Sequence, residues 1–142
     1  MYKDRFNTVL DYCQTKKIKV VFYDGDQDIC YPSTSLVCIR KSQSWKNRLF
    51  GLLHEIGHIQ IFRNKENWTK DFSLYSCENT DGRVQRSKKF QVSLIAEEID
   101  AWRIGRQIAE DLGIFFDPDE YKATMNECVF TYISSANNKV NS

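Results

Sequence analysis

The 142-residue sequence has no long apolar run and almost no excess charge of either sign. No segment approaches the ~20 apolar residues of a membrane-spanning helix, and the N-terminus alternates charged and apolar residues where a secretory signal needs an unbroken apolar stretch. Lys and Arg number 20 against 19 for Asp and Glu, so the formal net charge is +1. The chain therefore lacks the large positive charge that attracts nucleic acid. We therefore expect a cytoplasmic protein with no membrane and no nucleic-acid partner.

The sequence also lacks the paired cysteines of a disulfide framework. Its five cysteines form an odd set without a CxxC pair, whereas small secreted domains use an even number at regular spacings. Reduced thiols in the cytoplasm are the expected state. The cysteines are Cys13, Cys30, Cys38, Cys77 and Cys128.

Proline is scarce as well, and apolar residues are plentiful. With two prolines, 42% hydrophobic and 13% aromatic residues, the composition favours a packed core over a disordered chain. The amino-acid composition does not change along the chain, and the chain length is that of a protein with one hydrophobic core. We expect a single domain over residues 1–135, followed by a polar tail over residues 136–142 that frays.

The first part of the chain predicts one helix and a small sheet. Residues 3–15 place apolar side chains at helical spacing. Three extended runs rich in β-branched and aromatic residues then follow, with Asp24-Gly25 as a turn and Pro32 as a break. We expect these runs to form a small antiparallel sheet. They lie at residues 18–23, 28–31 and 35–40.

The turn after the first of these runs resembles part of a calcium-binding loop. Asp24, Asp26 and Asp28 alternate along it. An EF-hand loop, however, needs glycine at its sixth and glutamate at its twelfth position, and Ile29 and Ser35 stand there. A plain hairpin turn is therefore favoured over a calcium site.

The rest of the chain predicts three long helices. Ser44 can cap the first, Gly113 can end the second, and Asp117 can cap the third with Pro118 at its first helical position. The polar, irregular stretch 64–86 is long for a compact domain, and we expect it to form a mobile flap. Together with the sheet, these helices predict an α+β fold. They span residues 45–62, residues 87–112, and a segment that begins at Asp117-Pro118.

The sequence HEIGH at residues 54–58 carries the clearest chemical pattern. His54 and His58 lie one helical turn apart, so both imidazoles can reach one metal ion. Glu55 lies about 100° around the helix from His54, where it can take a proton from a water on the metal without being a ligand. Two core histidines satisfied by hydrogen bonds are the alternative, and that alternative must explain three polar side chains on a mostly apolar helix.

A catalytic zinc needs a third protein ligand, and the chain has no third histidine. A carboxylate, or less readily a cysteine, must complete the set. Glu98 lies in the apolar stripe of the second long helix, where an unpaired carboxylate would cost several kcal/mol. We therefore prefer Glu98 to Glu97, which shares its face with Ser93 in a more solvated setting. A buried ion pair between Glu98 and an arginine is the alternative.

At this point the chain resembles the ImmA/IrrE family of gluzincin metallopeptidases. In that family a helix reading HE, an aliphatic residue and GH precedes a second helix whose E-x-x-A glutamate completes a zinc site. HEIGH matches the first pattern, and Glu98-Ile99-Asp100-Ala101 matches the second. The resemblance covers residues 20–112. It implies a zincin-like fold, one Zn²⁺ per chain, and pairing of a peptide substrate along an edge strand at residues 35–40.

The expected function is that of a zinc-dependent metallopeptidase with a protein or peptide substrate. His54, His58 and Glu98 bind the metal and Glu55 acts as general base. The resemblance implies a regulatory protein of bacterial or phage origin as substrate. Tyr75, Tyr121 and Tyr132 are candidates for the donor to the oxyanion, and the sequence leaves the choice open. The alternative is a catalytically silent binding or inhibitory module with the same fold.

Overall fold

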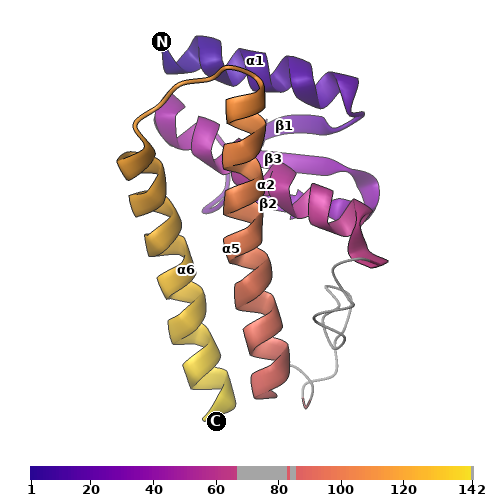
Figure 1. Ribbon diagram of the computed structural model, residues 1–142, viewed down its shortest axis with the longest axis vertical. Coiled ribbons are helices and arrows are strands. Elements are labelled where there is room, and N and C mark those ends of the chain that lie inside the picture. The colour runs from indigo at the N-terminus through magenta and orange to yellow at the C-terminus, as the bar shows by residue number, and fades with distance from the viewer. Residues whose placement is uncertain (67–82, 84–85, 142) are drawn as a thin grey trace.

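The computed structural model describes residues 1–66, 83 and 86–141. The described part is an α+β fold, as the sequence predicts, with a small sheet and four long helices (Figure 1). None of the described helices is both long and apolar enough to cross a membrane. The elements are α1 (Tyr2–Thr15), β1 (Lys19–Tyr23), β2 (Ile29–Tyr31), a 3-10 turn (Pro32–Thr34), β3 (Leu36–Arg40), α2 (Trp45–Arg63), α5 (Lys88–Asp111) and α6 (Pro118–Val140).

The sheet is mixed, so the prediction of an antiparallel sheet is wrong. Its strand order is β1-β3-β2, with β1 parallel to β3 and β2 antiparallel to it. The turn at Asp24-Gly25 therefore joins two strands that are not neighbours, and it is not a hairpin turn. The apolar side chains explain the order: Val37 and Ile39 of β3 are fully buried, whereas the residues of β1 and β2 are partly or fully exposed. The strand with the most buried side chains takes the central place.

The central position of β3 also overturns the expectation that residues 35–40 form an edge. Both sides of β3 are paired in the described sheet. The two edges are β1 and β2.

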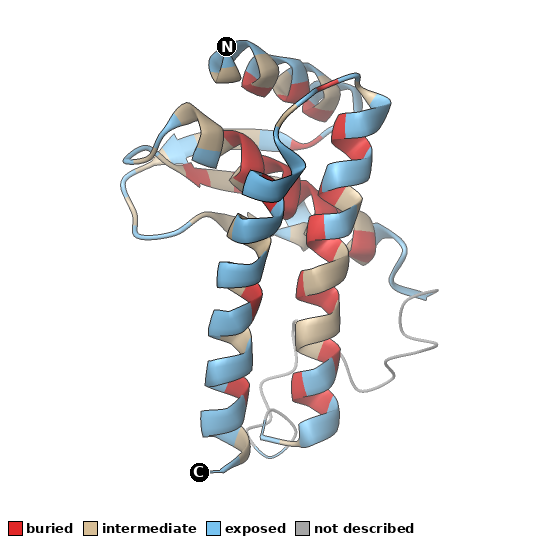
Figure 2. Cartoon of the chain, turned by 60° about the vertical axis from the view of Figure 1, so that its left-hand side comes forward, coloured by how far each residue is buried: buried red, intermediate tan, exposed pale blue. Residues whose placement is uncertain are grey.

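Helix α2 lies in the middle of the fold and is buried on nearly every side (Figure 2). It packs against the sheet and α1 on one side and against α5 on the other. The core that joins these elements includes Phe6 and Val9 of α1 together with Leu49, Leu52 and Leu53 of α2. A helix in this position can hold a polar side chain only if that side chain finds a partner.

Helices α5 and α6 run side by side in opposite directions (Figure 1). The predicted caps at Ser44 and Asp117 are present, since their side chains accept from backbone N–H groups at the starts of α2 and α6. Ser87 caps α5 in the same way, and Gly113 has φ +71° after that helix. Helix α6 continues to Val140 and buries Ala136. The predicted frayed tail over residues 136–142 is thus helical as far as residue 140, because an apolar residue there packs inward.

The predicted flap over residues 64–86 lies largely outside the described residues. Tyr75 and Cys77 belong to that part of the chain.

Candidate metal centre

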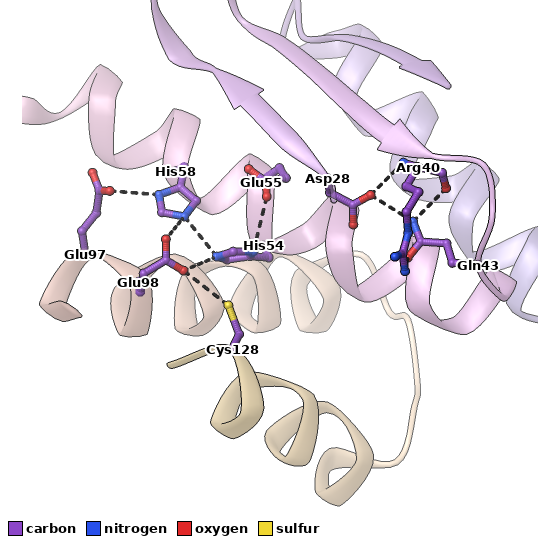
Figure 3. A network of polar contacts seen from close by, with 9 residues as sticks. All are labelled: Asp28, Arg40, Gln43, His54, Glu55, His58, Glu97, Glu98 and Cys128. Carbon is purple, nitrogen blue, oxygen red and sulfur yellow. Dashed lines mark hydrogen bonds and ion pairs between the residues drawn. The ribbon is translucent and has the colours of Figure 1, made fainter. Parts of the chain in front are cut away.

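Helix α2 brings its two histidines together on the side that faces α5 (Figure 3). The Nε2 atoms of His54 and His58 lie 3.0 Å apart, and His54 is only 7% exposed. The indole of Trp102 on α5 stacks on the His54 ring, with the ring centroids 4.3 Å apart and an interplanar angle of 10°. The packing therefore fixes the direction in which His54 points.

Glu98 of α5 reaches both histidines. Its Oε2 lies 2.8 Å from Nε2 of His54, and its Oε1 lies 2.9 Å from Nε2 of His58. Ligand atoms about 2.0 Å from a tetrahedral zinc lie roughly 3.3 Å from one another, so the three side chains need to open by only a few tenths of an ångström to hold an ion. The structure brings together the three residues that the sequence singles out as ligands.

No arginine pairs with Glu98 in the described part of the chain. The carboxylate is 3% exposed, and the side chains that it contacts include His54, His58, Cys128 and Tyr132. Burial alone would raise the pKa of Glu98, but the hydrogen bonds from the two histidines outweigh it and hold the pKa well below its usual value. The alternative of a buried ion pair with arginine is therefore wrong for the described residues.

Glu97 is buried too, contrary to the expectation that it lies in a solvated setting. Its exposure is 7%, and its Oε2 lies 3.1 Å from Nδ1 of His58. Ser93, the polar residue on the same face, does not mark a solvated surface, because it is itself only 1% exposed. A carboxylate that holds the second ring nitrogen of a histidine fixes the tautomer and the orientation of that ring, an arrangement common around protein-bound metals.

Glu55 lies on the far side of His54 from Glu98. It is 7% exposed, and its Oε1 lies 3.5 Å from Nδ1 of His54. Burial raises the pKa of Glu55 to about 8, and the charges of Glu98 and Asp28 act in the same direction. The structure thus provides a carboxyl group with a high proton affinity at the edge of the histidine pair.

The sequence argument did not anticipate Asp28 as a neighbour of this site. Its Oδ1 accepts from the backbone N–H of Arg40 at 2.8 Å and from Nε2 of Gln43 at 3.0 Å (Figure 3). Its Oδ2 lies only 2.1 Å from where a Cβ on Gly51 would stand. The absence of a side chain at Gly51 therefore lets this carboxylate approach α2 close to Glu55.

Cys128 of α6 is the second residue that the sequence argument did not assign to the site. Its Sγ lies 3.7 Å from Oε2 of Glu98. The ligand atoms of Cys128, His54 and Glu98 all lie within 4.8 Å of one another. A lone cysteine far along the sequence gives no spacing signal, because only the packing of α6 on α5 brings it here.

The two described tyrosines that were candidates for the oxyanion donor differ in their surroundings. Tyr121 is 2% exposed, and its hydroxyl donates to the backbone carbonyl of Trp102. Its one O–H group is therefore not available to an oxyanion. Tyr132 lies one turn after Cys128 on α6, where burial and the negative charge of Glu98 raise its pKa. Tyr132 is therefore the one of the two that lies near the ligand set.

Comparisons of the chain with protein-family models, with curated proteins and with solved structures find no match. The resemblance to ImmA/IrrE peptidases stays a prediction, and the chemistry must be argued from the geometry of these side chains.

Proposed function

We propose that the protein is a zinc-dependent metallopeptidase in which His54, His58 and Glu98 hold one Zn²⁺. The observation that carries this proposal is the buried convergence of three side chains from two helices: the two Nε2 atoms lie 3.0 Å apart, and each lies 2.8 or 2.9 Å from one carboxylate oxygen of Glu98. Two imidazoles and one carboxylate are a ligand set typical of hydrolytic zinc, because they leave a fourth position for water.

The roles of the chain's own residues follow from their positions. Zinc bound here would polarise the scissile carbonyl and lower the pKa of a water molecule. Glu55 accepts the proton of the attacking water and passes it to the leaving amine. The position of Glu55 supports this role, since the side chain is buried beside the ligand set with its Oε1 3.5 Å from Nδ1 of His54.

The proposed substrate is a protein or peptide that pairs with an edge of the sheet. Because β3 is central, the pairing edge must be β1 or β2. We favour β2, since it packs beside α2 and is preceded directly by Asp28, whose charge acts on Glu55. An extended peptide added to β2 would run past the ligand set with its backbone hydrogen-bonded to the sheet.

A catalytically silent binding module is the second candidate function. Cys128 favours it, because a fourth protein ligand would give the closed coordination that is typical of structural zinc. Glu55 favours the enzyme, since a structural site has no use for a buried base beside its ligands.

Zinc content and peptide cleavage together test the proposal. The purified chain should contain close to one zinc by elemental analysis, and His54→Ala and His58→Ala should each lose it. Glu55→Gln is the matched control, because it changes a neighbouring side chain that is not a ligand and should keep the zinc while cleavage of casein stops. Unchanged zinc in both histidine variants would disprove the site, and full activity in Glu55→Gln would disprove the role of the base.

A further inference from the structure

Helix α6 presents a thiol to the candidate metal centre. Sγ of Cys128 lies 3.7 Å from Oε2 of Glu98, and it belongs to the same compact group of ligand atoms as His54. The close view shows Cys128 approaching the pair of histidines from α6, on the side away from the sheet (Figure 3). The described chain thus offers a fourth ligand-type side chain, from a third helix.

The distance suits shared coordination. Zinc lies about 2.3 Å from a thiolate sulfur and about 2.0 Å from a carboxylate oxygen, so these two atoms stand roughly 3.5 Å apart in a tetrahedral site. The observed 3.7 Å is close to this separation. The Cys128 thiol donates a hydrogen bond to this carboxylate oxygen, so the sulfur already points at the ligand set.

A second observation at the same place concerns Trp102. Its Nε1 is buried and has no hydrogen-bond partner at normal geometry among the described residues. The same indole stacks on His54 and contacts the Cys128 side chain. A buried N–H group beside sulfur finds its acceptor once that sulfur is negatively charged, as a metal-bound thiolate is.

We propose that Cys128 is a fourth, displaceable protein ligand, which closes the metal site in the resting protein. This inference rests on the proposed zinc site. When the ligand forms, the S–H bond breaks and its proton leaves to solvent, while the sulfur–metal bond replaces the bond between the metal and a water molecule. Catalysis then requires that Cys128 withdraw and that water return to the fourth position.

The packing of α6 allows such a withdrawal. Of its 23 residues only Tyr121, Val129 and Ala136 are buried. The main anchor is at its start, where the Tyr121 ring contacts Phe50 and Phe116 at 5.1 Å between ring centroids and its hydroxyl donates to the Trp102 carbonyl. Cys128 lies two turns beyond this anchor, so a movement of the later part of α6 away from α5 would keep the anchor in place and would uncover only two buried residues, Val129 and Ala136.

X-ray absorption on the zinc-loaded full chain tests whether sulfur is a ligand. Wild type should show one sulfur at about 2.3 Å, and Cys128→Ala should show nitrogen and oxygen ligands only. Cys38→Ala is the matched control, since Cys38 lies on β3 away from this group, and Cys77→Ala covers the cysteine outside the described residues. Both controls should keep the sulfur. A cobalt-loaded sample should likewise lose its thiolate charge-transfer band only in Cys128→Ala.

Several outcomes would overturn the inference. Zinc bound by wild type through nitrogen and oxygen alone would do so even if Cys128→Ala failed to fold, and so would loss of the sulfur in Cys77→Ala. Cleavage should be faster in Cys128→Ala than in wild type, and equal rates in two zinc-loaded proteins would disprove the closing role. Failure of wild type to bind zinc would instead reject the proposed function itself. The two failures are therefore distinguishable.

Discussion

Gly57 of α2 lies so close to Ala101 of α5 that a Cβ at position 57 would stand 2.1 Å from the Ala101 carbonyl oxygen. Gly105 makes the reciprocal approach, since its Cβ would stand 2.6 Å from the carbonyl oxygen of Leu53. The two glycines let the helix backbones touch. Glu98 lies one turn before Ala101, so this contact is what brings its carboxylate within reach of the histidines. The glycine in HEIGH thus serves the ligand geometry through helix packing.

Gly57→Ala should therefore destabilise the protein and weaken zinc binding. Alanine for glycine in an exposed helix interior stabilises by about 1 kcal/mol, whereas a methyl group forced between two packed helices costs about 1–3 kcal/mol. The two cases change the free energy of unfolding in opposite directions, so the measurement shows whether Gly57 is packed against α5. Urea unfolding of the metal-free protein and zinc affinity are the measurements. A more stable variant with unchanged zinc affinity would show that the helices do not meet at Gly57.

Replacement of Glu98 and of Glu97 should separate a ligand from a positioning residue. Glu98→Ala should abolish tight zinc binding, because it leaves only two protein ligands. Glu97→Ala should weaken zinc affinity by roughly 10- to 100-fold, since it frees the Nδ1 side of His58. Titration with zinc against a competing chelator measures both.

The matched control for the positioning role is Glu97→Gln. Its side-chain oxygen can still accept from Nδ1 of His58, so it should restore most of the affinity that Glu97→Ala loses. Equal losses in Glu97→Gln and Glu97→Ala would contradict a hydrogen-bonding role, and a greater loss for Glu97→Ala than for Glu98→Ala would exchange the two assignments.

Tyr132→Phe should slow cleavage without loss of zinc. Tyr132 lies near Glu98 and is the described tyrosine best placed to donate to the oxyanion, and loss of such a donor lowers kcat by roughly 10²- to 10³-fold. Tyr121→Phe is the control. It should leave kcat unchanged and cost about 0.5–1.5 kcal/mol of stability, because it removes the hydrogen bond to the Trp102 carbonyl. Full activity of Tyr132→Phe would place the donor elsewhere.

The helices could be predicted from the sequence because their signals are local. Apolar residues recur at helical spacing, and Ser44, Ser87 and Gly113 mark ends within one turn of where the structure has them. The order of the strands could not be predicted, since pairing joins residues that are distant in the chain. Only in the structure does the full burial of Val37 and Ile39 mark β3 as the strand between the other two.

In the candidate site, too, the local features could be predicted from the sequence and the tertiary contacts could not. His54, Glu55 and His58 come from one turn of one helix, and the burial of Glu98 follows from the apolar residues around it. The roles of Glu97 and Cys128 depend on how closely α5 and α6 pack on their neighbours. Such distances are set by tertiary contacts, so a pattern along a single helix does not contain them.

The high pKa of Glu55 predicts how stability should vary with pH in the metal-free protein. Its ordinary pKa is 4.5, and burial in the folded state raises the pKa to about 8. The folded protein therefore keeps a proton that the unfolded chain has released. The contribution of Glu55 to stability is fully present below its unfolded pKa and is lost as the pH rises through its folded pKa. Between about pH 5 and pH 8, the free energy of unfolding should fall more in wild type than in a variant that cannot titrate there.

Glu55→Gln supplies that variant, because the amide has nearly the same shape and no proton to lose. Other titrating groups such as His58 and Glu98 remain in both proteins, so the difference in unfolding free energy between wild type and Glu55→Gln reports residue 55 together with its coupling to these neighbours. With a chelator present, urea unfolding should show this difference shifting against wild type as the pH rises. Glu127→Gln on the exposed side of α6 is the control, and it should follow wild type at every pH. Added zinc should reduce the shift, because a nearby cation favours the ionised carboxylate. A difference that does not change with pH would mean that Glu55 titrates normally and lies in water.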